Sequence, residues 1–302
     1  MNSKIIVIGS SNTDMVIKSK RFPKPGETIM GDEFLIFQGG KGANQSVAVA
    51  RAGGDVHFVC RVGNDSFGSN AINHYKAEGI HVSGIVQDEN VSTGIAFITV
   101  NDDGENTIIV ASGANAFLTV DQVIHAIETI QDSDWLITQL ETPLDVIVYL
   151  ANFAREKQKH LILNPAPAAV LPDEVYKGLF LITPNETETQ LLTGIEVIDE
   201  ASMKKAADIF KSKGVQNTLI TLGSKGAYVS TENFTGLIET IKVNAVDTTA
   251  AGDVFNGALV VALSEEKSWK AAVEFACKAA SISVTRMGAQ ASAPTRQEIE
   301  NY

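Results

Sequence analysis

The sequence predicts an α/β fold of three layers, with helices on both faces of a mostly parallel central sheet and a small antiparallel β lid. First, short apolar segments rich in isoleucine and valine recur along the chain, bounded by glycine and polar residues as buried strands are. Second, segments with helical periodicity separate most of them, and strands that alternate with helices favour a covered parallel sheet. Third, two regions of short alternating segments interrupt this order, which is typical of antiparallel pairing.

The strands of the predicted central sheet share one pattern. In the first, Lys4–Ile8, isoleucine and valine are followed by Gly9-Ser10-Ser11-Asn12, which indicates a buried strand and then a loop. The same pattern predicts strands at Val56–Val62, Trp135–Gln139, His160–Asn164, Leu179–Thr183 and Thr218–Leu222.

Helical patterns fill most of the intervals between these strands. They predict helices at Ala43–Ala52, Phe67–Glu78, Val120–Ile130, Leu144–Lys157, Thr187–Thr193 and Ser202–Lys213. The resulting architecture is Rossmann-like, and in such sheets ligands bind beyond the carboxyl ends of the strands.

The lid is predicted from two separate segments, about 15–38 and 92–112. They contain alternating stretches at Thr28–Gln38, Gly94–Val100 and Thr107–Ala111, and the turn Asn101-Asp102-Asp103-Gly104 joins the last two as a hairpin. Because core elements separate the two segments in sequence, we expect an excursion from a single domain spanning 1–302.

Composition and charge exclude several classes of partner. The chain has 302 residues, of which 44% are hydrophobic and 20% charged, and its net charge is −12. This charge repels nucleic acid and anionic membrane surfaces. The chain has two cysteines, Cys60 and Cys277, which cannot form a disulfide framework, and it has no apolar stretch of about 18 residues. A first apolar run of only four residues is too short for a signal peptide, so we expect a cytoplasmic protein without a membrane span.

Two familiar kinds of site are absent from the sequence. Gly40-Lys41 is followed by glycine rather than serine or threonine, so there is no Walker A loop. The five histidines are scattered and form no HExxH, which predicts isolated surface side chains rather than a zinc centre.

The strongest local feature is Asp247-Thr248-Thr249-Ala250-Ala251-Gly252-Asp253, which precedes a helical run. Small residues entering a helix leave backbone N–H groups uncovered at its positive end, where an oxyanion or phosphate can bind. Asp253 there could serve as a base that takes a proton from an alcohol while the N–H groups neutralise a phosphoryl group. The alternative is an ordinary carboxylate that complements the helix dipole.

A second glycine-rich segment, Gln38-Gly39-Gly40-Lys41-Gly42-Ala43-Asn44-Gln45, opens another predicted helix. Its glycines permit close approach of a ligand, and Lys41, Asn44 and Gln45 supply hydrogen-bond donors. The alternative is a tight connection between a strand and a helix with a solvated lysine.

Polar residues also follow several predicted strands. Asn12 and Asp14, predicted in the loop after the first strand, and Glu141 suit a polyhydroxylated ligand, although Asn and Asp are also common turn residues. Asn185 and Glu188 begin a helix, where they either cap it or organise a metal-bound phosphate. Thr221–Gly226 is either a plain hairpin or a slot for a nucleotide.

Taken in order, these pieces closely resemble the ribokinase-like carbohydrate kinase family, over residues 5–299. GGKGAN at 39–44 is similar to the N-terminal signature of the family, and DTTAAGD at 247–253 to its C-terminal signature. The Ala250-Ala251 pair, GSSNTD at 9–14 and TRMGAQ at 285–290 narrow the resemblance to the ribose kinases of that family.

The resemblance implies ATP-dependent phosphorylation of D-ribose at its 5-hydroxyl, with Mg²⁺ and K⁺. It implies Asp253 as the base and an anion hole made of Ala250, Ala251, Gly252 and Asp253. It assigns the sugar to Asn12, Asp14, Gly40, Lys41, Gly42, Asn44, Glu141 and Asp253. It assigns the nucleotide to Asn185, Thr221, Leu222, Gly223, Ser224, Lys225, Gly226, Gly252 and Cys277. It associates Glu188 with magnesium, and the potassium site with Asp247, Thr249, Ser283, Arg286, Gly288 and Ser292.

The resemblance also implies a homodimer formed through the β lid. Two alternatives to the ribose kinase stay open: a kinase of another sugar or of a nucleoside, and a sugar-binding regulator that has lost its chemistry.

Overall fold

The central feature of the fold is a sheet of eight strands in the order β14-β13-β12-β11-β10-β9-β1-β4, in a computed structural model that describes residues 3–302. The pairs from β4 to β12 are parallel, and β13 and β14 add an antiparallel edge. The strands span Lys4–Ile8 (β1), Asp55–Val59 (β4), Ser133–Thr138 (β9), His160–Leu163 (β10), Leu181–Ile182 (β11), Asn217–Thr221 (β12), Ala227–Ser230 (β13) and Thr235–Ile238 (β14).

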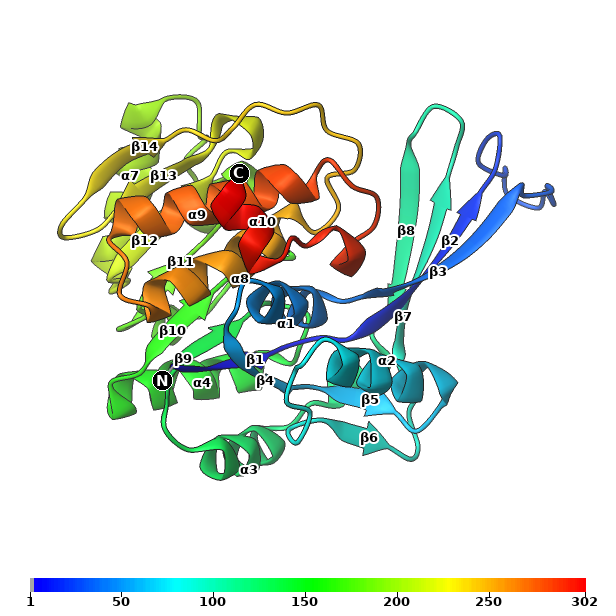
Figure 1. Ribbon diagram of the computed structural model, residues 1–302, viewed down its shortest axis with the longest axis horizontal. Coiled ribbons are helices and arrows are strands. Elements are labelled where there is room, and N and C mark those ends of the chain that lie inside the picture. The colour runs from blue at the N-terminus through cyan, green and yellow to red at the C-terminus, as the bar shows by residue number, and fades with distance from the viewer. Residues whose placement is uncertain (1–2) are drawn as a thin grey trace.

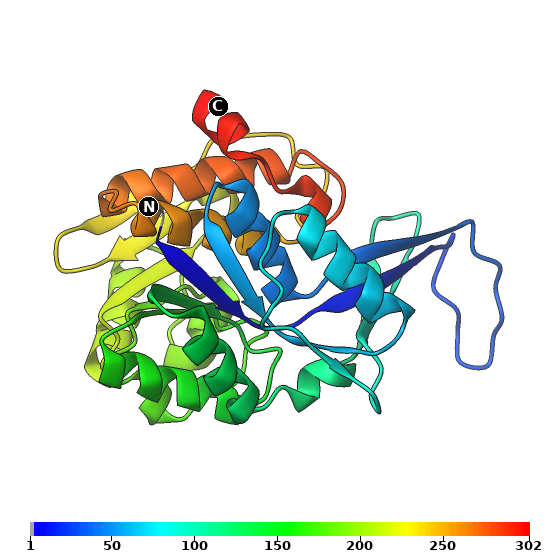
Figure 2. The same ribbon diagram turned by 60° about the horizontal axis from the view of Figure 1, so that its bottom comes forward.

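Helices cover both faces of this sheet, which confirms the predicted three layers (Figures 1 and 2). One face packs against α1 (Lys41–Arg51), α2 (Ser66–Ala77), α8 (Ala251–Ser264) and α9 (Trp269–Ser283). The other packs against α3 (Val120–Ile130), α4 (Leu144–Lys157), α5 (Asp173–Tyr176), α6 (Glu186–Thr193) and α7 (Glu200–Lys213). The last helix, α10 (Arg296–Asn301), packs against α9.

The lid is a second sheet, in the order β3-β2-β7-β8, that projects away from the central sheet (Figure 1). It consists of β2 (Asn12–Lys18), β3 (Glu33–Gly39), β7 (Gly94–Val100) and β8 (Asn106–Ala111). The outer pairs are antiparallel as predicted, whereas β2 and β7 pair in parallel. A third, two-stranded sheet joins β5 (Arg61–Gly63) to β6 (Val86–Asp88).

Two details of the predicted elements were wrong. Asn12 and Asp14 do not lie in a loop, because β2 begins at Asn12 and both residues pair with β3 and β7. The strand predicted at Val56–Val62 is interrupted at Cys60, since its second half leaves the central sheet and pairs with β6. Both details depend on partners distant in the sequence.

The core lies between the sheet and its helices. Ile5, Val7, Val260 and Val261 are among the buried residues of the α1–α8–α9 side, and Ile6, Ile8, Leu136 and Leu161 of the opposite side. Strand residues thus alternate between the two cores, as a sheet covered on both faces requires. None of the helices in residues 3–302 combines the length and the apolar character that spanning a bilayer requires.

Candidate active site

Predicted site residues lie together where the parallel strands of the central sheet end, at their carboxyl ends. Asn12 follows β1, Glu141 follows β9, Asn185 follows β11, and β12 ends at Thr221. Asn12 and Glu141 line a cavity of about 470 Å³, beside Val110 of the lid. The carboxyl ends of the strands are where an open parallel sheet is expected to bind its ligand.

The glycine-rich segment brings the start of α1 against the end of β1. Gly40 has φ +89°, and a Cβ there would lie 2.7 Å from the Asn12 backbone nitrogen, so only glycine fits. The Lys41 N–H donates to Glu141 Oε2 at 3.0 Å, which ties α1 to the residue after β9. Gly42 is buried against the Gly9 backbone and its N–H donates to the Ser10 hydroxyl at 3.3 Å, so the structure gives it a packing contact.

The second signature opens α8 with an uncapped N-terminus. Ala250, the N-cap, has φ +60° and ψ +10° and offers no capping side chain. The Ala251 N–H donates to the Thr248 carbonyl at 3.2 Å. Across residues 3–302, the N–H groups of Gly252 and Asp253 have no protein acceptor. A Cβ built on Gly252 would meet no atom within 4 Å, so the backbone there faces open space. Uncapped N–H groups at a helix start form an anion site.

Asp253 lies buried in the first turn of α8, between two amides of α1. Asn44 Nδ2 donates to its Oδ2 at 2.9 Å, and Gln45 Nε2 donates to its Oδ1 at 3.0 Å. Burial raises the pKa of Asp253, and Lys41 and the two amide hydrogen bonds oppose this increase. The Asp253 carboxylate is in turn the main cause of the raised pKa of Lys41, so the lysine is a cation beside the helix start.

A buried amide network behind Asp253 was not predicted. Gln45 Nε2 also donates to Asn164 Oδ1 at 3.1 Å, and Gln45 Oε1 accepts from Gln139 Nε2 at 2.6 Å. Gln45, Gln139 and Asn164 are all buried, and they come from α1 and from the ends of β9 and β10. Of these residues, Gln45 alone stood out in the sequence, as a donor in the glycine-rich segment. The network fixes the orientation of the Asp253 carboxylate.

Beside the cavity, β2 presents Asn12 and Asp14. Burial raises the pKa of Asp14 to about 6, and the Glu141 carboxylate adds to the increase. Asn12 Oδ1 accepts a hydrogen bond from Asn115 Nδ2 at 2.7 Å. Asn115 is buried and lines the same cavity, but its place after β8 gave no sequence signal. Among the described residues, the buried hydroxyl of Thr142, also in the cavity wall, has no hydrogen-bond partner.

The region predicted to bind the nucleotide also lies at the carboxyl ends of the strands, beyond β11 and β12. Asn185 and Glu188 form a capping box at the start of α6, each side chain accepting from the other's N–H at 2.8 Å. Glu188 is nevertheless buried, and burial raises its pKa. Thr221 bridges to Asn185 and leads into the turn Leu222–Gly226.

Cys277 is connected to this turn through Thr240. A Cβ on Gly226 would lie 2.8 Å from the Thr240 nitrogen, and the Thr240 hydroxyl donates to the Cys277 carbonyl at 3.4 Å. The Cys277 thiol is buried, which raises its pKa to about 11, so the thiol is neutral.

The residues predicted for potassium lie in a loop cluster next to the start of α8. Asp247 accepts from the N–H groups of Thr249 and Gly288, both at 2.9 Å. Burial alone would raise the pKa of Asp247, but these bonds outweigh it and hold the pKa below its usual range. Ser283 ends α9 and receives the Arg286 N–H at 3.0 Å, and the buried Ser292 donates to the Ala289 carbonyl at 2.7 Å.

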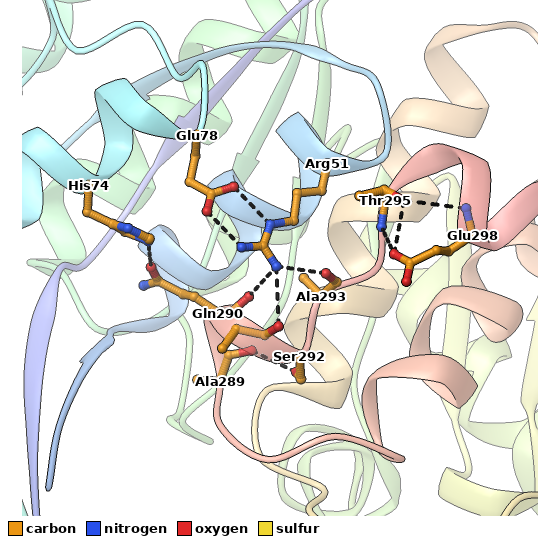
Figure 3. A network of polar contacts seen from close by, with 10 residues as sticks. Arg51, His74, Glu78, Ala289, Gln290, Ser292, Ala293, Thr295 and Glu298 are labelled. Atoms are coloured by element: carbon orange, nitrogen blue, oxygen red, sulfur yellow. Dashed lines mark hydrogen bonds and ion pairs between the residues drawn. The ribbon is translucent and has the colours of Figure 1, made fainter.

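Arg51 anchors the segment that ends this cluster (Figure 3). Its guanidinium, at the end of α1, binds both carboxylate oxygens of Glu78 at 2.8 and 2.7 Å. It also donates to the carbonyls of Gln290 and Ala293, at 3.0 and 2.8 Å. The side chain of Arg286 pairs with Glu298 of α10, so of Arg286 only the backbone is turned toward Ser283.

Comparison with known proteins gives consistent results. The family described as pfkB family carbohydrate kinase matches residues 2–296. A ribokinase of Haemophilus influenzae is 48% identical over 298 residues, which are 99% of this chain and 97% of that protein. A deoxyribokinase of Salmonella typhi is 35% identical over 300 residues, 99% of this chain and 98% of that one. The structure of Arabidopsis thaliana ribokinase complexed with ribose and ATP matches with a TM-score of 0.93 at 30% identity, over 100% of this chain and 98% of the other.

Proposed function

The chain belongs to the pfkB family of carbohydrate kinases, and we propose that it transfers the γ-phosphoryl group of ATP to the 5-hydroxyl of D-ribose. The products are D-ribose 5-phosphate and ADP. One observation carries the proposal: a buried carboxylate, Asp253, is fixed by two amides within one residue of uncapped helix N–H groups. A base beside an anion site is the arrangement that phosphoryl transfer to an alcohol requires.

The sugar is proposed to bind between the lid and the central sheet. Asn12, Asp14, Asn44 and Glu141 present amide and carboxylate groups, which suit a ligand made of hydroxyl groups. In the described part of the chain, Asn44 Oδ1 is buried without a hydrogen-bond partner, so it is available to accept from a sugar hydroxyl. Lys41, a cation between Asp253, Glu141 and Glu188, supplies a donor at the junction of the two substrates.

In the reaction, Asp253 takes the proton of the sugar 5-hydroxyl. The 5-oxygen attacks the γ-phosphorus of ATP, and the bond between the γ-phosphorus and the oxygen that bridges to the β-phosphate breaks. The N–H groups of Gly252 and Asp253 donate to the phosphoryl oxygens, on which negative charge develops. The raised pKa of Asp253 brings the carboxylate closer to the basicity that a general base needs. Closure of the lid excludes water, the competing acceptor.

Two metal ions are proposed on the basis of the oxygen donors present. Mg²⁺ would be held mainly by phosphate oxygens, with Glu188 as the nearby carboxylate, and when bound it neutralises phosphate charge. K⁺ is assigned to the loop of Asp247, Thr249, Ser283, Gly288 and Ser292, because two backbone N–H groups keep the Asp247 carboxylate there ionised. Asn185, Thr221–Gly226 and Cys277 are proposed to contact ATP.

We further propose a homodimer formed through the lid. Ile36, Met15, Phe97 and Ile109 lie opposite one another across all four lid strands, and Ile36, Phe97 and Ile109 are 51%, 45% and 76% exposed. A contiguous apolar face of this kind is typical of an interaction site. Asp14 lies on the other face, toward the cavity, so dimer contacts and sugar binding use opposite sides of one sheet.

We also propose a single kinase domain, 1–302, with the lid as its excursion, and a cytoplasmic location. The lid strands are interleaved in sequence with β1, β4 and β5 of the remainder, which supports one folding unit. The two cysteines are free and buried, in keeping with a reducing compartment.

A coupled assay of ADP release, run with a panel of pentoses, hexoses and nucleosides, tests this function. We expect ribose to give the highest kcat/KM and 2-deoxyribose a much lower value, because a site built to bind a hydroxyl rejects a substrate without it. A higher kcat/KM for a hexose or nucleoside would show that ribose is not the preferred substrate. Comparable kcat/KM for the two pentoses would contradict specificity for ribose. Ribose binding in calorimetry without ADP release would instead indicate a regulator.

A further inference from the structure

A cluster of metal-ligating side chains lies at the opposite end of the strands from the proposed active site. Asp55 begins β4, His57 lies two residues later, and His81 follows α2. Residues two apart on a strand face the same side of a sheet. His81 is bridged to His57 by backbone hydrogen bonds, since its N–H donates to Val56 and its carbonyl accepts from Phe58, both at 3.0 Å. The backbone therefore fixes all three side chains on one side of β4.

Their side chains converge. His81 Nε2 lies 3.0 Å from Asp55 Oδ1, and His57 Nε2 lies 4.0 Å from the same oxygen. The two imidazole rings stack with centroids 4.3 Å apart. One ligand atom from each of the three residues lies within 4.8 Å of the others. Donors around a tetrahedral Zn²⁺ are about 3.3 Å apart for bonds of about 2.0–2.1 Å, so side-chain rotations would have to shorten these separations by at most about 1.5 Å.

His57 supplies an imidazole that the protein does not fully hydrogen-bond. Its side chain is only 13% exposed, and within residues 3–302 its Nδ1 has no hydrogen-bond partner. The Lys4 ammonium on the neighbouring strand β1 is bound to the carbonyls of Ile130 and Gln131, at 3.0 and 3.2 Å, rather than to this cluster.

We propose that Asp55, His57 and His81 form a binding site for a borderline divalent transition-metal ion, Zn²⁺, with water completing its coordination. Two imidazole nitrogens and one carboxylate oxygen match zinc and not Mg²⁺, which prefers oxygen ligands. The site joins the edge strand β4 to the segment after α2. Because it lies at the amino end of β4, the ion links two elements and takes no part in phosphoryl transfer.

Calorimetry with ZnCl₂ tests the site, on untagged protein freed of metals with EDTA and kept in MgCl₂. We expect one Zn²⁺ per chain for the wild type and for His125→Ala, a control histidine exposed on α3. His81→Ala, which removes a half-exposed ligand, should lower the affinity at least about tenfold. Co²⁺ should give visible d–d absorption in the wild type and none in His81→Ala. Zn²⁺ should raise the Tm of the wild type and of His125→Ala, but not that of His81→Ala.

The proposal fails if the wild type binds no Zn²⁺, or if His81→Ala keeps the stoichiometry and affinity of the wild type. Asp55→Asn, which preserves side-chain shape, decides the matter should His81→Ala unfold in EDTA, and unchanged affinity there would also overturn the site. Kinase activity is not the readout, so this test is independent of the proposed function.

Discussion

Asp253 combines two properties that oppose each other in free solution, burial and charge. Burial disfavours the carboxylate form, while Lys41 and the amides of Asn44 and Gln45 favour it. Fixed amides also hold both oxygens, so the carboxylate cannot turn away when a hydroxyl approaches. The residue-scale account is therefore one of position as much as of basicity.

Gly252 offers a test of the anion site that separates stability from activity. The variant Gly252→Ala adds a methyl group to open space in the first turn of α8, where alanine is a better helix residue by about 1 kcal/mol. We expect an unchanged or higher Tm, because nothing in the protein is displaced. We expect kcat to fall at least about tenfold, because the methyl group occupies the space of the phosphoryl oxygens.

The matched control is Ala271→Gly, which alters the first turn of α9, outside the proposed site, and adds no atoms. It should keep kcat within about threefold of the wild-type value. A Gly252→Ala enzyme with normal kcat would show that the phosphoryl group lies elsewhere.

We expect Asp14 to make ribose binding at the proposed sugar site depend on pH. Its pKa, raised to about 6 by burial and by Glu141, means that free protein protonates Asp14 as the pH falls through about 6. The protonated carboxyl group is a poorer acceptor for sugar hydroxyls. The Kd of ribose, measured by calorimetry, should therefore rise about tenfold between pH 7 and pH 5.

Two variants assign this pH effect to its carboxyl group. Asp14→Asn should bind ribose more weakly but with an affinity that is flat over this pH range, whereas Asp253→Asn should retain the pH dependence. If the Kd of ribose for Asp14→Asn still rose about tenfold between pH 7 and pH 5, the assignment would be refuted.

At the scale of elements, the site depends on contacts between α1, α8 and the segment after α9. Arg51 ends α1 and joins α2 through Glu78 to the carbonyls of Gln290 and Ala293 (Figure 3). Gly288 of the same segment donates to Asp247, a proposed potassium ligand. The salt bridge thus supports the loop cluster from outside.

Arg51→Ala should weaken that support. We expect a loss of about 2–4 kcal/mol in the free energy of unfolding, because Glu78 and three carbonyls lose a charged, half-buried partner. We also expect a higher KCl concentration for half-maximal activity. Urea unfolding and a KCl titration of kcat measure the two effects.

Arg21→Ala is the control for this variant, since Arg21 makes a similar pair with Glu27 on the exposed lid. It should leave the Tm and the KCl requirement unchanged. Equal behaviour of the two variants would show that Arg51 does not support the cation loop.

Secondary-structure elements were predicted well where a local sequence pattern defines them. The prediction failed where pairing with a distant segment determines the element. The helices at Val120–Ile130 and Leu144–Lys157 were predicted to the residue, because periodicity and flanking residues define them. The turn of β5 into a separate sheet depends on β6, about 25 residues later, and no local pattern indicates it.

Site residues follow the same rule. Asp253 and Gly252 were singled out from the sequence because small residues directly precede a helix, and their roles stay a prediction. Gln139 and Asn164 were missed because each is an ordinary polar residue until the fold brings it to Gln45. The histidines were predicted to be isolated, yet His57 and His81 stack, since a backbone bridge joins positions 24 residues apart.

At the scale of the whole molecule, the acidic charge and the lid bear on which partners the protein can bind. The net charge of −12 repels extended phosphate backbones. The proposed site would offer a single nucleotide the local positive charge of Lys41 and the uncapped N–H groups at the start of α8. The lid carries its apolar face on the side away from Asp14. We propose this apolar face as the contact with a second copy of the chain.

Ile109→Glu tests the lid dimer. A carboxylate placed in the apolar row with Phe97 should raise the dimer dissociation constant at least about tenfold, measured by sedimentation. Val170→Glu, at an 81% exposed position outside the lid, should leave the dimer intact. A monomeric wild type, or an unaffected Ile109→Glu variant, would contradict the lid interface.

The most direct test of the central claim is the kcat of Asp253→Asn with ribose and ATP. The variant keeps the size of the side chain and removes the base, so kcat should fall about 10²- to 10⁴-fold while the fold and ribose binding persist. Asp208→Asn, an exposed carboxylate on α7, should keep the wild-type kcat. An Asp253→Asn enzyme with nearly wild-type kcat would contradict the assignment of the base, and with it the proposed mechanism.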